Sequence, residues 1–158
     1  MVKANFDRAI FTLEHRSGIG VVLRDDQGSV LASLSQLVSQ VYNPLEIEAL
    51  AAAAALRFAL DLGFSQVVLE GDSQVLMEDL INDYKFLSSE GLLMDDTRTF
   101  ARFFSQLRYS HVNRKCNKVV YRLARHALSI SNFVIWMEDV LPPFISAVLA
   151  NNNIAGFS

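Results

Sequence analysis

The segment "VVLEGDSQVLMEDL", residues 67–80, constrains the fold most, because it begins as an apolar run without polar alternation. A run of valine and leucine of this length is typical of a strand that is covered on both faces. Ser73 is a natural N-cap for the helix that follows the run. The segment therefore predicts a buried strand that leads directly into a helix, as in an α/β domain.

Asp72 lies in the loop between that strand and that helix. In open α/β sheets, ligands bind outside the carboxyl ends of such strands, so Asp72 occupies a typical functional position. An acid in a strand-to-helix loop is also common as a solvated turn residue. The position of Asp72 alone leaves both interpretations open.

Strand patterns come before this unit, and helix patterns come after it. Strands are expected at residues 2–11, 17–26 and 29–41, and "DDQG" between the last two is a hairpin turn signal. A helix is expected from Asn43 to about Leu62. The order along the whole chain, βββαβααβα followed by a tail, predicts one mixed sheet with helices packed on it.

The chain after Gly71 is expected to be mainly helical. The expected helices lie at about residues 73–83, 90–106 and 117–128, with a short strand at residues 107–112. Residues 1–132 are expected to form the domain. Residues 133–158 are expected to form a C-terminal tail that packs on this domain or extends it, as an extended piece and a short amphipathic helix.

A chain of 158 residues with 51% apolar residues fits one globular domain with a substantial core. No run approaches the roughly 18 apolar residues of a membrane span, because charges interrupt every candidate. Lys3, Asp7 and Arg8 interrupt any signal-peptide core, and the single Cys116 cannot form an internal disulfide. We therefore expect an intracellular protein, in the cytoplasm or the nucleus, with no membrane contact and an oligomeric state that the sequence does not indicate.

Basic residues are concentrated in one part of the chain, although its formal net charge is −3. Residues 97–137 contain eight lysines and arginines and no acid. Clustered basic residues can form a phosphate-binding surface even on an acidic chain. A solvated helix face that is basic by chance explains the cluster equally well.

Five segments occur in the order "NFDRAIF", "GIGVVLRDDQG", "EIEALAAAAALRFALDLGF", "VVLEGDS" and "HVNRKCNKVVYRLARHAL". Together they resemble the ribonuclease H-like domain over residues 3–129, and within it the plant-type branch, which also occurs in reverse-transcriptase-related proteins of retroelements. The resemblance implies an α/β fold. Its sheet is expected to be mixed and five-stranded, with three antiparallel strands and then two parallel ones, flanked by helices.

Active members of this family cleave the RNA strand of an RNA/DNA hybrid with two Mg²⁺ or Mn²⁺ ions, which four carboxylates hold. Position by position, the resemblance places three of these at Asp7 in "NFDRA", Glu48 in "EIEAL" and Asp72 in "EGDS". Two cations about 4 Å apart can bridge the scissile phosphate, activate water and stabilise the leaving oxygen, but several carboxylates must hold them. The resemblance therefore implies Asp7, Glu48 and Asp72 as catalytic metal ligands.

Two positions depart from the family pattern. Tyr121 stands where the fourth acid is expected, and a neutral phenol with a pKa near 10 is a poor Mg²⁺ ligand. Arg8 follows the first aspartate where the family usually has glycine, so a large side chain stands where substrate backbone would approach.

Two classes of function follow from this pattern. The first is a metal-dependent ribonuclease that hydrolyses RNA/DNA hybrids. The second is a catalytically impaired or inactive module of the same fold that binds nucleic acid or a protein partner. The residues expected to bind nucleic acid are Arg8, Arg108, Arg114, Lys115, Asn117 and Lys118.

Overall fold

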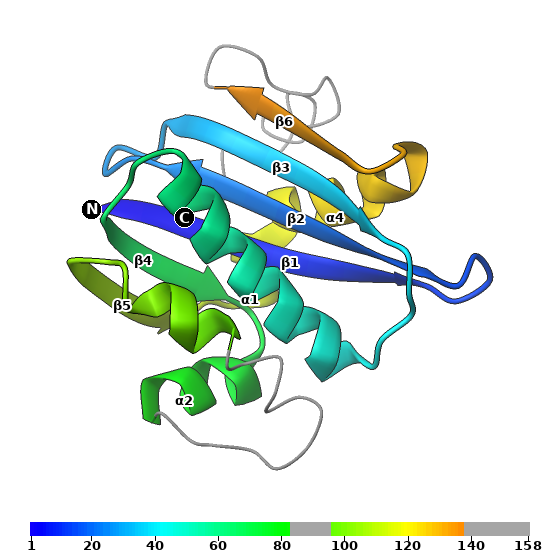
Figure 1. Ribbon diagram of the computed structural model, residues 1–158, viewed down its shortest axis with the longest axis horizontal. Coiled ribbons are helices and arrows are strands. Elements are labelled where there is room, and N and C mark those ends of the chain that lie inside the picture. Colours follow the sequence, from blue (N-terminus) through cyan, green and yellow to red (C-terminus); the bar gives the residue numbers. More distant parts are fainter. Residues whose placement is uncertain (83–95, 138–158) are drawn as a thin grey trace.

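A mixed sheet of six strands forms the centre of the protein (Figure 1). The structure is a computed structural model, and it describes residues 1–82 and 96–137. The strands are β1 (Val2–Phe11), β2 (Arg16–Arg24), β3 (Val30–Val38), β4 (Gln66–Gly71), β5 (Gln106–His111) and β6 (Phe133–Met137). Their spatial order is β5-β4-β1-β2-β3-β6. Strands β1, β2, β3 and β6 pair antiparallel, whereas β4 runs parallel to both β1 and β5.

Helices cover both faces of this sheet. The α-helices are α1 (Pro44–Asp61), α2 (Gln74–Asn82) and α4 (Lys118–His126), and the 3₁₀ turns are η1 (Arg114–Asn117) and η2 (Ala127–Ser129). Residues 96–101 are also helical. Figure 1 shows α1 crossing one face of the sheet and α4 lying on the other. Within the described ranges, no helix is long and apolar enough to cross a membrane.

Successive residues of the strands supply the two layers of the core. Val21 belongs to the large apolar cluster under α1, whereas the next residue, Val22, packs with Val120 and Leu123 of α4. This separation follows from the strand geometry, in which neighbouring side chains point to opposite faces. Because both faces are covered, β2 is buried along nearly its whole length.

Two glycines of β2 let α4 lie directly on the sheet. A Cβ atom at Gly20 would lie 2.2 Å from the Val120 carbonyl oxygen, and one at Gly18 would lie 2.2 Å from the Ala124 carbonyl oxygen. Asn117, just before α4, donates a hydrogen bond from Nδ2 to the Phe6 carbonyl oxygen at 2.8 Å. The start of α4 is thereby fixed against β1, one residue away from Asp7.

The expected α/β fold with a mixed sheet is confirmed, and the sheet has one strand more than the five expected. The additional strand, β6, pairs antiparallel with β3 from Ala32 and Met137 to Gln36 and Phe133. It corresponds to the extended piece expected at the start of the C-terminal segment. The short helix expected after it lies outside the described residues.

One expected helix ends earlier than the sequence indicates. The first part of the expected segment, residues 90–95, lies outside the described residues, and the helix that follows ends at residue 101. The backbone N–H groups of Ser105 and Gln106 both donate to the Ser65 carbonyl oxygen. This contact draws the chain into the sheet next to β4, so Gln106 begins β5.

Candidate metal and nucleic-acid site

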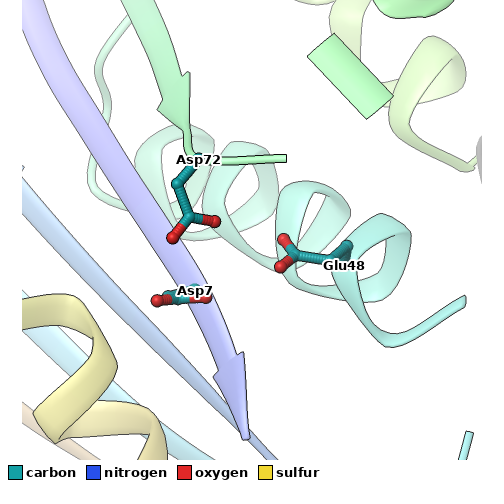
Figure 2. A group of neighbouring side chains, drawn as sticks. All are labelled: Asp7, Glu48 and Asp72. Atoms are coloured by element: carbon teal, nitrogen blue, oxygen red, sulfur yellow. The ribbon is translucent and has the colours of Figure 1, made fainter. Parts of the chain in front are cut away.

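Three carboxylates, from Asp7 on β1, Glu48 on α1 and Asp72 just after the end of β4, point toward one another (Figure 2). One ligand oxygen from each residue lies within 4.8 Å of those of the other two. The strand register explains two of the positions. Asn5 of β1 is paired with Glu70 of the parallel strand β4. Asp7 and Asp72 each follow two residues later, so they emerge side by side.

Capping interactions fix where the two helices near the site, α1 and α2, begin. The Asn43 side chain accepts a hydrogen bond from the Glu46 N–H at 2.8 Å, and Glu46 Oε1 accepts one from the Asn43 N–H at 3.0 Å. This capping box sets the start of α1, which places Glu48 in its second turn. Ser73 Oγ accepts a hydrogen bond from the Leu76 N–H at 3.3 Å, which confirms its predicted role at the start of α2.

All three carboxyl groups of the cluster have raised pKa values. Burial, followed by the neighbouring charge of Asp72, raises the pKa of Asp7 from 3.8 to about 7. Burial, followed by the charges of Asp7 and Asp72, raises the pKa of Glu48 from 4.5 to about 8. Burial also raises the pKa of Asp72. Clustered acids with raised pKa values are typical of sites that bind a cation or move protons.

Glu48 provides a direct test of whether a cation fits this cluster. Its side chain is buried, with the residue only 4% exposed. Its Oε2 atom has no hydrogen-bond partner among the described residues. A buried carboxylate oxygen without a partner is costly, and a bound divalent cation would satisfy it. Mg²⁺ and Mn²⁺ suit this donor set, because all three ligands are hard carboxylate oxygens.

Arg8 supplies one positive charge within the site. Its Nε atom lies 3.3 Å from Glu48 Oε1, and its side chain is 29% exposed. The backbone N–H of Arg8 donates to Asp7 Oδ1 at 2.8 Å. The large side chain that the sequence placed after the first aspartate is therefore turned toward the carboxylates.

A pocket of about 960 Å³ opens over the carboxylates. Arg114, Lys115 and Lys118 of η1 and α4 line it, together with Arg8 and Tyr121. Four of the six residues expected to bind nucleic acid thus lie around the same pocket. Tyr121, expected at the fourth acidic position, borders the pocket together with the three carboxylates.

Two residues expected to bind nucleic acid lie elsewhere. Arg108 is exposed on β5 and does not line the pocket. Asn117 is fully buried, and its amide is engaged with the Phe6 carbonyl. A direct contact of Asn117 with nucleic acid therefore remains a prediction, whereas its contact with β1 is present in the structure. Its position in the motif reflects a structural role, which is to hold η1 and α4 on β1.

The structure adds residues to the site for which the sequence patterns predicted no role. His111, at the end of β5, lies with Nε2 3.2 Å from the Asp72 carbonyl oxygen. Its place in the "HV" motif was the one sequence feature that could have indicated that His111 lies near the site. Leu45 and Val75 line the pocket from the first turns of α1 and α2. No sequence pattern distinguishes these two from ordinary apolar residues at the start of a helix.

The chain belongs to the reverse transcriptase-like family, whose model matches residues 5–127. It is similar to the RNase H1 of the halophilic archaeon Halobacterium salinarum, with 27% identity, a TM-score of 0.75, and coverage of 81% of this chain and 97% of that one. It is also similar to the N-terminal RNase H domain of a Mycobacterium tuberculosis protein, with 25% identity, a TM-score of 0.70, and coverage of 82% and 95%.

A third structure shares the fold at 20% identity. It is an RNase H1 solved in complex with an RNA/DNA hybrid, with a TM-score of 0.69 and coverage of 82% of this chain and 97% of that one. No curated protein sequence matches this chain. The family is thus reverse transcriptase-like, and the fold is that of RNase H domains, as the sequence motifs indicated.

Proposed function

We propose that the protein is a metal-dependent nuclease domain that hydrolyses the RNA strand of RNA/DNA hybrids. The observation that carries this proposal is the convergence of Asp7, Glu48 and Asp72 to within 4.8 Å, in a fold shared with RNase H domains. The neighbour solved with a bound hybrid supports the choice of substrate. The Mycobacterium tuberculosis RNase H domain supports the choice of reaction.

In this proposal, Asp7, Glu48 and Asp72 hold Mg²⁺ or Mn²⁺. When bound, such ions favour attack by water on a phosphodiester and stabilise the charge that develops on its oxygens. Tyr121 contributes no charge at the fourth position. The three carboxylates therefore suffice for one ion, whereas a second ion has fewer charged ligands and is held more weakly.

The basic residues around the pocket bind and orient the strand. Arg114, Lys115 and Lys118 are exposed, the first two in η1 and the third at the start of α4. Their charges offset the repulsion between a nucleic-acid phosphate and the three carboxylates. Such contacts position a strand without reading its sequence. Hybrid recognition would then rest on helix shape and 2′-hydroxyl groups.

Cleavage of an end-labelled RNA/DNA hybrid in Mg²⁺ and, separately, in Mn²⁺ tests this function. We expect RNA-strand cleavage that stops in EDTA and falls at least about a hundredfold in Asp72→Asn, because the variant loses a charged ligand. Gln66→Asn, an exposed change at the start of β4, is the matched control. Cleavage that persists in Asp72→Asn, or in EDTA, would contradict the proposal.

Two observations favour a second candidate, a nucleic-acid-binding module without turnover. Tyr121 replaces the fourth carboxylate, and Arg8 pairs with Glu48. This candidate uses the same pocket and the same basic residues. It predicts that the protein binds hybrid in the cleavage assay and that no product forms in either metal.

A further inference from the structure

Apolar residues line part of the pocket, in addition to its charged groups. Four residues, Pro44, Leu45, Val75 and Tyr121, form what we term the apolar wall. Val75 is 57% exposed and Tyr121 is 43% exposed, although both are large apolar side chains. Exposed apolar surface that is grouped at a pocket and surrounded by charge is typical of a binding surface.

Tyr121 does not serve the core of the protein. Helix α4 buries Val119, Val120, Leu123 and Ala124 toward the sheet. Tyr121 lies on its exposed side and borders the pocket instead. Lys118 is three residues earlier on the same helix, so the phenol ring and the ammonium group lie on the same side, one turn apart.

The cations and the aromatic ring that line the pocket together indicate which kind of ligand it binds. The cations of Arg114, Lys115 and Lys118 suit phosphates, and the ring of Tyr121 suits a flat apolar face. A nucleotide carries both groups a few ångströms apart. Proteins that bind single-stranded nucleic acid combine a basic groove with aromatic side chains in this way.

We propose that Tyr121 is a stacking platform for an unpaired nucleobase, so that the preferred ligand is a hybrid with a single-stranded RNA segment next to the bound strand. This inference rests on the proposed function for the identity of the bound strand. A base within a continuous duplex has both faces covered by its neighbours. Only a base at a junction, an end or a single-stranded segment can place a face on the Tyr121 ring.

The test compares the binding of three fluorescent ligands in EDTA, which prevents metal-dependent cleavage. The first is a blunt RNA/DNA hybrid, and the second is the same hybrid with a short single-stranded RNA extension. The third is the extended hybrid with abasic sites in its extension. We expect the extended hybrid to bind about tenfold more tightly than the other two, as one stacked base allows. Tyr121→Leu, which keeps an apolar side chain, should abolish this preference. Tyr121→Phe, which keeps the ring, should retain it.

A second readout is independent of affinity. A 2-aminopurine in the extension should lose fluorescence on binding to the native protein and to Tyr121→Phe, but not to Tyr121→Leu. Equal binding of blunt and extended hybrids by the native protein would overturn the inference. So would an equal loss of affinity for all three ligands in Tyr121→Leu. A Tyr121-dependent preference in a protein that fails to cleave in Mg²⁺ and Mn²⁺ would support the platform while contradicting the nuclease function.

Discussion

Arg8 Nε lies 3.3 Å from Glu48 Oε1, so the candidate metal site already contains a cation that belongs to the chain. The contact is an ion pair when Glu48 is ionised, and Arg8 Nε makes no hydrogen bond within the described residues. Glu48 thus has one oxygen beside a guanidinium group and another without a partner. A divalent ion at this site must share Glu48 with Arg8.

Removing this arginine should therefore strengthen metal binding. We expect Arg8→Gly to bind Mn²⁺ about tenfold more tightly than the native protein, which corresponds to about 1.4 kcal/mol. Isothermal titration calorimetry at a pH above 8, where the carboxyl groups are ionised, measures the change. Arg8→Met, which removes the charge but keeps most of the bulk, separates charge from space and should show a similar gain. Unchanged or weaker Mn²⁺ affinity in both variants would contradict this account of the ion pair.

The raised pKa values of Asp7 and Glu48 predict how the stability of the metal-free protein depends on pH. Their folded-state pKa values, about 7 and about 8, exceed the ordinary values of 3.8 and 4.5. Their contribution to stability is therefore full below about pH 4 and is lost as the pH rises to about 8, because the unfolded chain releases these protons more readily. We expect the free energy of unfolding in EDTA to fall by at least about 1.4 kcal/mol over this range.

Urea denaturation of the native protein and Asp7→Asn, in EDTA at several pH values, measures this loss. The variant cannot ionise at position 7, so it should lose less stability than the native protein and be the more stable of the two at pH 8. If the free energy of unfolding depends on pH in the same way in both proteins, the claim that burial raises the pKa of Asp7 is contradicted.

The basic residues at the pocket should govern affinity for nucleic acid. We expect the double variant Lys115→Glu and Lys118→Glu to bind hybrid at least about tenfold more weakly, because phosphate contacts dominate such affinities. Its affinity should also depend less steeply on salt, with the logarithmic slope smaller by about one unit for each lysine–phosphate interaction that the variant cannot make. Fluorescence anisotropy at several salt concentrations gives both quantities.

Arg108→Glu is the matched control, since Arg108 is an exposed basic residue that does not line the pocket. It should change the affinity much less than the double variant does. Equal effects of the two would show that the overall charge of the protein matters and the position of the basic residues does not.

A carboxylate at position 121 should improve the second ion's coordination. We expect Tyr121→Asp to raise the amount of Mn²⁺ bound at a given concentration and to increase hybrid cleavage in Mg²⁺ by about tenfold or more, because the fourth charged ligand returns. Tyr121→Asn has a similar size without the charge and should not share the gain. If Tyr121→Asp leaves metal binding and cleavage unchanged while its fold persists, the tyrosine is not what limits the site.

The sequence was informative about this site wherever a residue's position follows from local structure. Asp7 lies on β1, Asp72 directly follows the parallel strand β4, and Glu48 lies one turn into a capped helix. The strand and helix patterns, together with the family motifs, were therefore enough to predict their convergence. Contacts between distant segments were not predictable in the same way. The Arg8 side chain meets Glu48 forty residues later in the chain, and no local pattern specifies that geometry.

Asn117 is another residue whose tertiary contact the local sequence pattern did not predict. Its place in a basic segment suggested a contact with nucleic acid, whereas its amide is buried against the Phe6 carbonyl. Strand β6 was expected only as an extended piece, because its pairing with β3 joins two segments that are far apart in the chain. Each of these features is a tertiary contact between segments that are far apart in sequence.

Binding of Mn²⁺ to the native protein tests the central claim, that Asp7, Glu48 and Asp72 form a divalent-cation site. Titration followed by calorimetry or by the electron paramagnetic resonance signal of free Mn²⁺ gives both the number of ions bound and their affinity. We predict at least one saturable site in the native protein, a loss of at least about tenfold in affinity in Asp72→Asn, and competition by Mg²⁺. Absence of saturable Mn²⁺ binding at a pH above 8, or binding of equal strength in Asp72→Asn, would contradict the assignment of these three residues.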